Sequence, residues 1–250
     1  KYDKSEIYFR NILRSKPNDE EVACLFYNMG LSYCLKGDYA RSLDSYDRAY
    51  HMHLNTRPPR LISAAKTLNG MGVVYGEQEN YVKAIEYFQL ALKIYKRYLQ
   101  HRHVDIGGTL NNLGNVYREQ GKFDLAIEYF RKAQKINGSL PPNHPNMALT
   151  LNNLGTAYFD KENYSVAIDY YQKALKIKEK TLPTEHQDIA HSLHNIALFY
   201  ASDNEYKRAL EFHQRSLEMA KSVLPINHPF IQILEINIEH EKQKISDSVL

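Results

Sequence analysis

Asparagine side chains recur in the middle of otherwise apolar segments, and their chemistry gives the first indication of function. Asn111 and Asn112 form one adjacent pair, and Asn152 and Asn153 form another. An amide both donates and accepts hydrogen bonds, which suits it to hold the backbone of an extended peptide whatever its side chains are. Alternatively, the amides bond to one another or to water between neighbouring helices. The pattern indicates either a peptide-binding surface or a polar contact between helices.

The histidines and the other motifs do not form a catalytic or metal centre in the sequence. His191 and His194 are three residues apart on a predicted helix, but no nearby cysteine or carboxylate completes a metal site. Residues 70–76, GMGVVYG, have the glycine spacing of a dinucleotide-binding loop, yet they lie inside a predicted helix with no strand before them. No Ser/His/Asp, P-loop or paired-carboxylate pattern stands out. We expect no enzyme activity, no metal and no cofactor.

A five-residue phrase that contains the asparagines returns along the chain at a nearly constant interval. It reads FYNMG at 26–30, LNGMG at 68–72, LNNLG at 110–114 and 151–155, and LHNIA at 193–197. Its last residues are therefore 42, 42, 41 and 42 positions apart, which is typical of a solenoid of repeated units. Such a fold offers a long surface in place of a single pocket.

Each repeat contains two segments with the spacing of an amphipathic helix. In the third repeat, Ile106, Leu110 and Leu113 follow one another at three- and four-residue steps before a break at Gly121. The fold class is therefore predicted to be all-α, an α–α solenoid of helix-turn-helix repeats. We expect first helices near 20–36, 61–78, 104–120, 146–161 and 188–203, and second helices near 39–53, 81–98, 123–136, 164–181 and 206–223.

The residue types within each unit carry a family resemblance. A tyrosine follows the repeat glycine by three residues, an aromatic residue opens the second helix, and two alanines stand seven apart, as at Ala126 and Ala133. This combination resembles the tetratricopeptide repeat (TPR). The 42-residue period, with PPNHP and PINHP between units, is similar to the kinesin light chain variety and to related scaffolds that bind regulators of G proteins. The resemblance implies a right-handed α–α superhelix.

The boundaries follow from the phrase and from the prolines between units. We expect one array over residues 1–250, with a half repeat at 1–14, repeats at about 20–59, 61–101, 104–142, 146–184 and 188–226, and a capping helix at 228–245. The half repeat matches a second helix without a first, so the array is expected to begin earlier in a longer parent protein. Glu239 stands at the glycine position of the last helix, whose outer side reads as polar.

The third repeat is one residue short, and the shortfall lies between Ala133 and His144. We expect its second helix to end at Ile136 or Asn137, with Gly138 in the left-handed conformation after it. His144 and the histidines at the matching places of other repeats are expected to be loop or cap residues.

In TPR arrays the first helices line a concave groove, so the resemblance implies which side chains point into it. Families with this phrase use its asparagines to hold a peptide, and we favour that role here. Kinesin light chains also place many basic residues there for acidic cargo, whereas Lys66 and Arg118 are nearly alone in this chain, which argues against such cargo. The expected groove residues are Tyr27, Asn28, Leu31, Lys66, Asn69, Val73, Asn111, Asn112, Asn115, Arg118, Asn152, Asn153, Thr156, Phe159, His191, His194, Asn195 and Leu198.

Composition narrows the classes of partner. The net charge is +3 over 250 residues with interleaved signs, so neither nucleic acid nor an anionic membrane surface is expected as a partner. No apolar run approaches the length of a membrane span, and the first residues do not form a signal peptide. Cys24 and Cys34 stand on one predicted helix about 15 Å apart, too far for a disulfide. A reducing, cytoplasmic location is expected.

The sequence thus predicts a protein-interaction module that holds a peptide or helical segment of a partner in its concave groove. We expect a monomer. One alternative is self-association of the array. Another is a regulatory or substrate-recruiting role within a larger protein, because kinesin-light-chain-like arrays are also found fused to catalytic domains such as ADP-ribosyltransferases.

Overall fold

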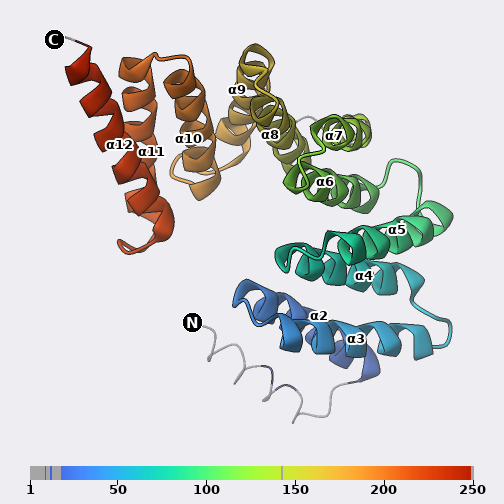
Figure 1. Ribbon diagram of the computed structural model, residues 1–250. Coiled ribbons are helices and arrows are strands. Elements are labelled where there is room, and N and C mark those ends of the chain that lie inside the picture. The colour runs from blue at the N-terminus through green and yellow to red at the C-terminus, as the bar shows by residue number, and fades with distance from the viewer. Residues whose placement is uncertain (1–8, 10–11, 13–17, 142, 249–250) are drawn as a thin grey trace. The chain divides into compact units, whose positions relative to one another are not determined.

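The structure is a computed structural model that describes residues 9, 12, 18–141 and 143–248 (Figure 1). The expected half repeat at 1–14 therefore lies outside the described residues, apart from Phe9 and Ile12. The described part of the chain forms eleven α-helices and no strand. The chain divides into two compact units, which we call unit 1 (Lys1–Gly121) and unit 2 (Lys122–Leu250) and describe separately.

Unit 1 consists of consecutive helix pairs. Helices α2 and α3 pack together, as do α4 and α5, while α3 contacts α4 and α5 contacts α6. The first helices also touch one another, because α4 contacts both α2 and α6. The five helices are α2 (Asp19–Leu35), α3 (Tyr39–Asn55), α4 (Leu61–Glu77), α5 (Tyr81–Tyr98) and α6 (Val104–Glu119).

Unit 2 repeats this arrangement with a helix at each end. The pairs α8–α9 and α10–α11 pack closely, with α7 against α8, α9 against α10 and α11 against α12. The six helices are α7 (Phe123–Asn137), α8 (Pro145–Asp160), α9 (Tyr164–Thr181), α10 (Gln187–Ser202), α11 (Tyr206–Val223) and α12 (Pro229–Asp247). Every helix in the two units begins and ends within two residues of its predicted position. The predicted all-α solenoid of helix-turn-helix repeats is confirmed.

Histidines start four of the first helices. His103, His144, His186 and His228 each precede a helix, and the Nδ1 of each accepts a hydrogen bond at 3.1–3.2 Å from the backbone N–H two residues later. These bonds satisfy backbone donors that have no partner within the helix. The recurrent histidines are therefore caps, as predicted.

The turn inside each repeat always contains a residue with positive φ. The φ angles are 74° at Gly37, 58° at Glu79, 71° at Gly121, 59° at Glu162 and 61° at Asn204. This left-handed residue lets the chain reverse immediately after the first helix. Only two of the five are glycines, so glycine content alone does not identify the position.

The prediction for Gly138 is half wrong. Helix α7 ends at Asn137, as expected, but Gly138 has φ −66° and ψ −13°, in the right-handed region. Its N–H bonds to the carbonyl of Gln134, and Ser139 and Leu140 continue with turns of the same hand. The left-handed residue of this loop is Asn143, with φ 63°. The short loop therefore reverses direction later than the sequence indicated.

The repeat glycine allows the two helices of a pair to approach closely. A Cβ atom at Gly155 would lie 2.6 Å from Cδ1 of Tyr171, and one at Gly72 would lie 2.6 Å from Cε1 of Phe88. Gly30 faces Tyr46 in the same way. These rings are buried. The glycine and the aromatic ring thus set how far the first helix stands from the second.

Candidate functional site

The first helices carry the residues predicted to face a partner. We use "first-helix face" for the side chains six, three and two positions before, and one and four positions after, the repeat glycine or the residue in its place. In unit 1 these come from α2, α4 and α6, and in unit 2 from α8, α10 and α12, where Ala197 and Glu239 take the glycine position of α10 and α12. Each unit has its own such face.

In unit 1 the part from α2 and α4 combines aromatic, apolar and basic side chains. The ring of Tyr27 packs edge-on against Tyr46 at 5.5 Å, and Nζ of Lys66 lies 5.3 Å from the centre of the Tyr27 ring. Leu31 is 46% exposed, and Asn28 is also exposed. A partner can therefore reach this edge directly.

The predicted asparagines of unit 1 do not all reach the surface. Asn112 Nδ2 donates to Oδ1 of Asn69 at 3.3 Å and joins α6 to α4. Asn111 is only 2% exposed, so the prediction that it presents its amide to a partner is wrong. It stands one residue before Asn112, a rotation of about 100° around the helix, and this turns it into the core. Val73, Asn69, Asn112 and Asn115 are half-buried.

In unit 2 the same amide contact appears between α8 and α10. Asn195 Nδ2 donates to Oδ1 of Asn152 at 3.1 Å, across 43 residues of sequence. We call each bonded pair, Asn69–Asn112 and Asn152–Asn195, an amide rung. The alternative in which the asparagines bond to one another is thus realised in both rungs. A primary amide has two N–H groups and two acceptor positions, so one bond does not exhaust it.

The side chains near the unit 2 rung are polar or aromatic, and none of them is charged. Thr156 donates to the carbonyl of Asn152 at 3.1 Å and accepts from the hydroxyl of Tyr171 at 3.2 Å. The Phe159 ring packs edge-on against Tyr164 at 5.2 Å. Nδ2 of Asn153 is buried and lacks a hydrogen-bond partner among the described residues. The residue as a whole is half-buried, so its role as a peptide contact stays a prediction.

His194 connects the first-helix face to a buried polar chain. Its Nδ1 lies 2.9 Å from Nε2 of His213 on α11, and Nδ1 of His213 lies 2.6 Å from Oε1 of Glu241 on α12. His213 and Glu241 are 0% and 1% exposed. The two ring nitrogens of His213 thus face different partners, Nδ1 the carboxylate and Nε2 the imidazole of His194, and the three side chains form one continuous hydrogen-bonded chain. This chain ties three helices together and was not predicted.

The two groove histidines are uncharged at neutral pH. Burial, with smaller contributions from the neighbouring His213 and His191, lowers the pKa of His194 to about 4. Burial also lowers the pKa of His191, whose ring centre lies 3.9 Å from that of Phe230 on α12. Both rings therefore act as neutral, partly apolar surfaces beside the half-buried Leu198.

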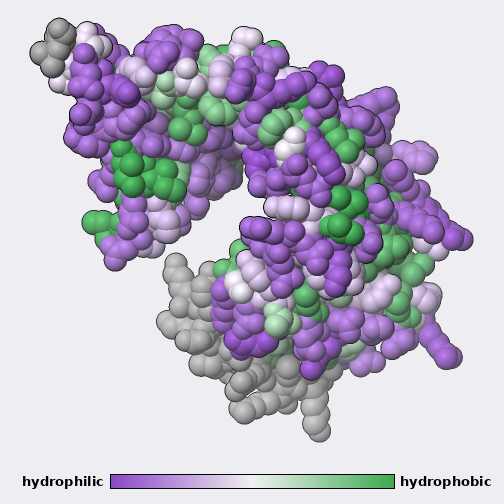
Figure 2. Space-filling view, viewed as in Figure 1, coloured by the Kyte–Doolittle hydropathy of each residue, from purple (hydrophilic) through white to green (hydrophobic). Residues whose placement is uncertain are grey.

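Helix α12 exposes apolar side chains on its first-helix face. Ile233 is 47% exposed and Ile236 is 67% exposed, and Leu149 on α8 is 51% exposed. Figure 2 shows hydrophobic side chains gathered on the visible surface over α11 and α12. The prediction of a strongly polar outer side holds for Glu235, Glu239 and other exposed charges but misses these isoleucines.

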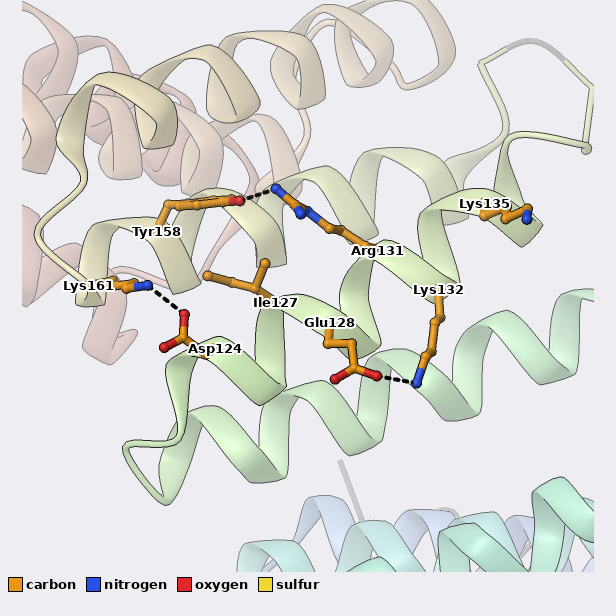
Figure 3. A pocket seen from close by; sticks show the side chains of 8 residues that line it. All are labelled: Asp124, Ile127, Glu128, Arg131, Lys132, Lys135, Tyr158 and Lys161. Carbon is orange, nitrogen blue, oxygen red and sulfur yellow. Dashed lines mark hydrogen bonds and ion pairs between the residues drawn. The ribbon is translucent and has the colours of Figure 1, made fainter.

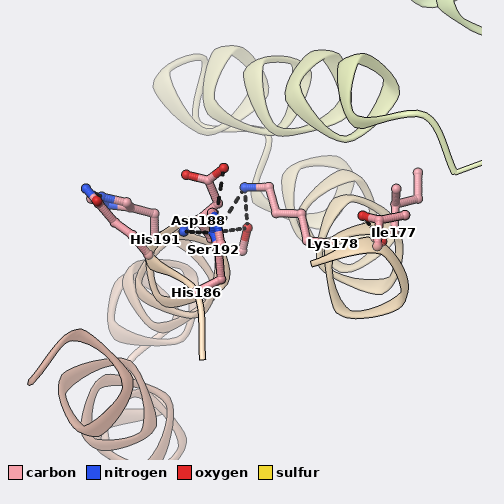
Figure 4. Close-up of polar contacts among 8 residues, drawn as sticks. Ile177, Lys178, His186, Asp188, His191 and Ser192 are labelled. Carbon is pink, nitrogen blue, oxygen red and sulfur yellow. Dashed lines mark hydrogen bonds and ion pairs between the residues drawn. The ribbon is translucent and has the colours of Figure 1, made fainter. Parts of the chain in front are cut away.

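A lysine holds the second helix of the fourth repeat to the next first helix. Nζ of Lys178 donates to the Asp188 carbonyl at 3.0 Å and to Oγ of Ser192 at 2.8 Å (Figure 4). Burial lowers the pKa of Lys178. At the equivalent place in the third repeat, Asn137 donates to Oγ1 of Thr150 at 2.8 Å. These contacts serve packing between repeats.

A cavity of about 540 Å³ lies between α7 and α8, where its lining combines basic and acidic side chains (Figure 3). Lys161 pairs with Asp124 at 2.5 Å, Lys132 with Glu128 at 2.5 Å, and Arg131 donates to the Tyr158 hydroxyl at 2.6 Å. Because each carboxylate is exposed and paired with a lysine, neither has the environment of a general acid or base. The cavity does not have the features of an active site.

Among the described residues, no group of three or more histidine, cysteine or acidic side chains is arranged to hold a metal ion. Within the same residues, no helix is both long enough and apolar enough to cross a membrane. The basic residues of the unit 1 face are few, and Arg118 pairs with the adjacent Glu119.

Comparison with known families decides the class. The family model described as "Tetratricopeptide repeat" matches residues 21–97, 63–139, 105–180 and 146–222. The chain belongs to the tetratricopeptide-repeat family. No curated protein matches the sequence significantly. The predicted TPR resemblance is confirmed, and such arrays are typically non-catalytic scaffolds for protein contacts.

Solved structures share the fold of this TPR chain. BtubC (BKLC) from P. vanneervenii is 18% identical, with a TM-score of 0.72 over 91% of this chain and 92% of that one. A kinesin-light-chain-type protein of Podosopora anserina with nearly identical TPR-like repeats is 18% identical, with a TM-score of 0.63 over 83% and 99%. The apo form of RapI is 17% identical, with a TM-score of 0.63 over 98% and 97%. The fold is thus shared with kinesin-light-chain-like proteins.

Proposed function

We propose that this TPR chain is an interaction module that holds a peptide or helical segment of a partner protein along its first-helix faces. The observation that carries the proposal is the amide rung, which recurs in both units at the same repeat positions. Each face also has an exposed apolar side chain, Leu31 on α2 in unit 1 and Leu149, three residues before Asn152, on α8 in unit 2. Amide groups left over after the rung bond can pair with a peptide backbone, and the apolar neighbours can bury partner side chains.

Deletion of a complete rung tests the proposal more cleanly than deletion of one amide. Asn152→Ala with Asn195→Ala removes both partners, so neither is left facing an unpaired group. Alanine also favours the helix more than asparagine does. We expect the fold to survive and partner binding to weaken by about 1–3 kcal/mol, because peptide groups of the partner lose their hydrogen bonds.

The measurement is a pull-down with the 250-residue chain, followed by peptide tiling of the retained protein and calorimetric titration of the tiled peptide. Lys93→Ala with Lys176→Ala is the matched control, because both lysines are exposed on second helices. We expect that double variant to bind normally. Equal losses in the two double variants would place the partner elsewhere, and unfolding of the asparagine variant would mean that the rung serves packing.

The alternative to binding of another protein is self-association of the array through the first-helix face. Light scattering over a range of protein concentrations separates the two. We expect a constant monomer mass, with a partner segment supplied by another protein. A mass that rises with concentration and returns to the monomer value in the rung variant would favour the self-associating array.

A further inference from the structure

The first-helix face of unit 2 carries no formal charge. Its fifteen positions contain amides, histidines, a threonine and apolar residues, in a chain of which 24% is charged. On α8 they are Leu149, Asn152, Asn153, Thr156 and Phe159; on α10, His191, His194, Asn195, Leu198 and Ala201; on α12, Ile233, Ile236, Asn237, His240 and Gln243.

Many charges of unit 2 lie on its second helices. These helices carry exposed ion pairs, such as Lys132–Glu128 on α7 and Lys173–Asp169 on α9. On α12, however, three positions of the first-helix face share a cavity with charged side chains; the cavity is lined by Ile236, Glu239, His240, Gln243, Lys244 and Asp247. The uncharged surface therefore covers α8, α10 and the beginning of α12 up to Ile233, and charges border it farther along α12.

His191 and His194 do not add charge to this face at neutral pH. Nδ1 of His194 is hydrogen-bonded to His213 of the buried chain that ends at Glu241, and burial, together with the two neighbouring histidines, lowers the pKa of His194 to about 4. Burial also lowers the pKa of His191, whose ring packs against the buried ring of Phe230 on α12. The two imidazoles of α10 are therefore neutral where α10 meets α12.

Exposed aliphatic residues stand at matching positions of that surface. Leu149 on α8 and Ile233 on α12 both lie six residues before the glycine position, and about half of each side chain is exposed. The amide rung joins α8, which carries Leu149, to α10, and His191 of α10 contacts Phe230 of α12, the helix that carries Ile233. Exposed aliphatic side chains on the same face as an amide pair fit a partner whose side chains are apolar and whose backbone forms hydrogen bonds.

We propose that the unit 2 first-helix face binds an uncharged, apolar-rich segment of a partner protein, with apolar side chains covering Leu149 and Ile233. This inference rests on the proposed interaction function and specifies its partner. An acidic or basic side chain buried on this face would lose its hydration without gaining a counter-charge, so charged segments are disfavoured. The unit 1 face differs, because its Lys66 is exposed.

Selection from a random peptide library displayed on phage tests the inference without knowledge of the natural partner. The bait is the full 250-residue chain, and selected peptides are synthesised and titrated by fluorescence anisotropy. We expect peptides rich in leucine, isoleucine, valine or aromatic residues and poor in Asp, Glu, Lys and Arg. Their affinity should change less than about twofold between roughly 50 and 500 mM salt, since no ion pair contributes to binding.

Charge insertion then locates the site. Leu149→Asp and Ile233→Asp should each weaken the selected peptides at least about tenfold. Leu90→Asp is the matched control, because Leu90 is 49% exposed but lies on second helix α5. We expect it to change affinity less than about twofold. Circular dichroism of each variant checks that the helices remain.

The outcomes separate this inference from the function it rests on. Selection of acidic or basic peptides that still require the Asn152–Asn195 rung would overturn the uncharged-partner inference and leave the interaction function standing. Apolar peptides that bind Leu149→Asp and Ile233→Asp normally would also overturn the inference. If no selected peptide depends on either rung, the proposed function itself fails.

Discussion

The fourth and fifth repeats, both in unit 2, fill the same place between their helices with different chemistry. In the fourth repeat, Gly155 faces the ring of Tyr171 so closely that a Cβ atom would lie 2.6 Å from it. In the fifth, the glycine position is Ala197 and the ring position is His213, which is fully buried. An imidazole is smaller than a phenol ring, which is consistent with an alanine in place of glycine.

The change of ring also changes what the repeat contacts. Tyr171 needs only one polar partner, which Thr156 of its own repeat supplies at 3.2 Å. His213 has two ring nitrogens, and they bond to His194 in its own repeat and to Glu241 on the last helix. In the fourth repeat the close approach of the two helices holds the pair together. The fifth repeat, which is the last complete one, is also joined to α12 by buried hydrogen bonds.

Removal of Glu241 should have the largest effect on stability. Glu241→Leu leaves the buried Nδ1–H of His213 without its acceptor, and because hydrogen bonds to a carboxylate are among the stronger ones, the loss should lie at the upper end of about 1–3 kcal/mol. Urea denaturation followed by circular dichroism measures the loss. The control is the quadruple variant Ala197→Gly, Leu198→Thr, His213→Tyr, Glu241→Leu, which gives the fifth repeat the glycine, threonine and tyrosine of the fourth and removes the carboxylate. Equal instability of the two variants would mean that the polar chain does not account for the loss.

Substitution of the repeat glycine should have the next largest effect. Gly155→Leu forces α8 away from the Tyr171 ring and should cost about 1–3 kcal/mol by overpacking. Gly108→Ala is the control, because a Cβ atom there meets no other atom within 4 Å. That variant should gain up to about 1 kcal/mol from helix propensity. A melting temperature unchanged by Gly155→Leu would contradict the packing described for the fourth repeat.

Acidification should weaken the fifth repeat through His194. Its pKa is about 4 in the folded chain against a usual value of 6.5, mainly because it is buried. Between those pH values the unfolded chain binds a proton that the folded chain does not, so stability falls as pH falls. The loss from pH 7 to pH 4 should reach at most about 3 kcal/mol.

Comparison with a variant isolates this contribution from the other titrating groups. His194→Asn keeps an N–H donor toward His213 but cannot be protonated in this range. The difference in unfolding free energy between the parent chain and the variant should therefore narrow on acidification. A difference that is constant from pH 7 to pH 4 would show that His194 titrates normally in the folded protein.

The smallest change in stability is expected from substitutions in the turns of the fourth and fifth repeats. Glu162 and Asn204 both have positive φ, at 59° and 61°. Glycine adopts this conformation freely and asparagine tolerates it, whereas glutamate is strained there. Glu162→Gly should stabilise the chain by up to about 1 kcal/mol, and Asn204→Gly should change it less. Thermal melts of the two variants test the order, and a larger gain at Asn204 would contradict it.

Local patterns were enough to predict the helices. The spacing of apolar residues, the recurrent glycine and the prolines between units predicted each described helix to within two residues. The close contact at Gly155 is also local, because it joins two helices that are neighbours in sequence, and the glycine and aromatic residues that form it recur in several repeats. The turn residues were harder, since Glu79 and Glu162 adopt a conformation that their side chains do not favour.

The candidate site depended more on tertiary structure. Asn111 and Asn112 are adjacent and identical, yet one is buried and the other forms a rung with Asn69. The sequence placed both in the groove because a repeat pattern identifies a helix face only to within a residue or so. The exposed Ile233 was missed because the last helix was expected to be a cap with a polar outer side, although Ile233 stands at the same repeat position as Leu149.

The sequence by itself determined the repeat, its helices and the steric contact inside each pair, because these depend on residues close together in the chain. Only the tertiary structure decided which polar atoms meet. The bond between Asn152 and Asn195 spans 43 residues, and the chain from His194 through His213 to Glu241 spans three helices. Hydrogen bonds require partners within about 3 Å and a suitable angle. A periodic sequence fixes the order of the repeats but not atomic positions at that precision.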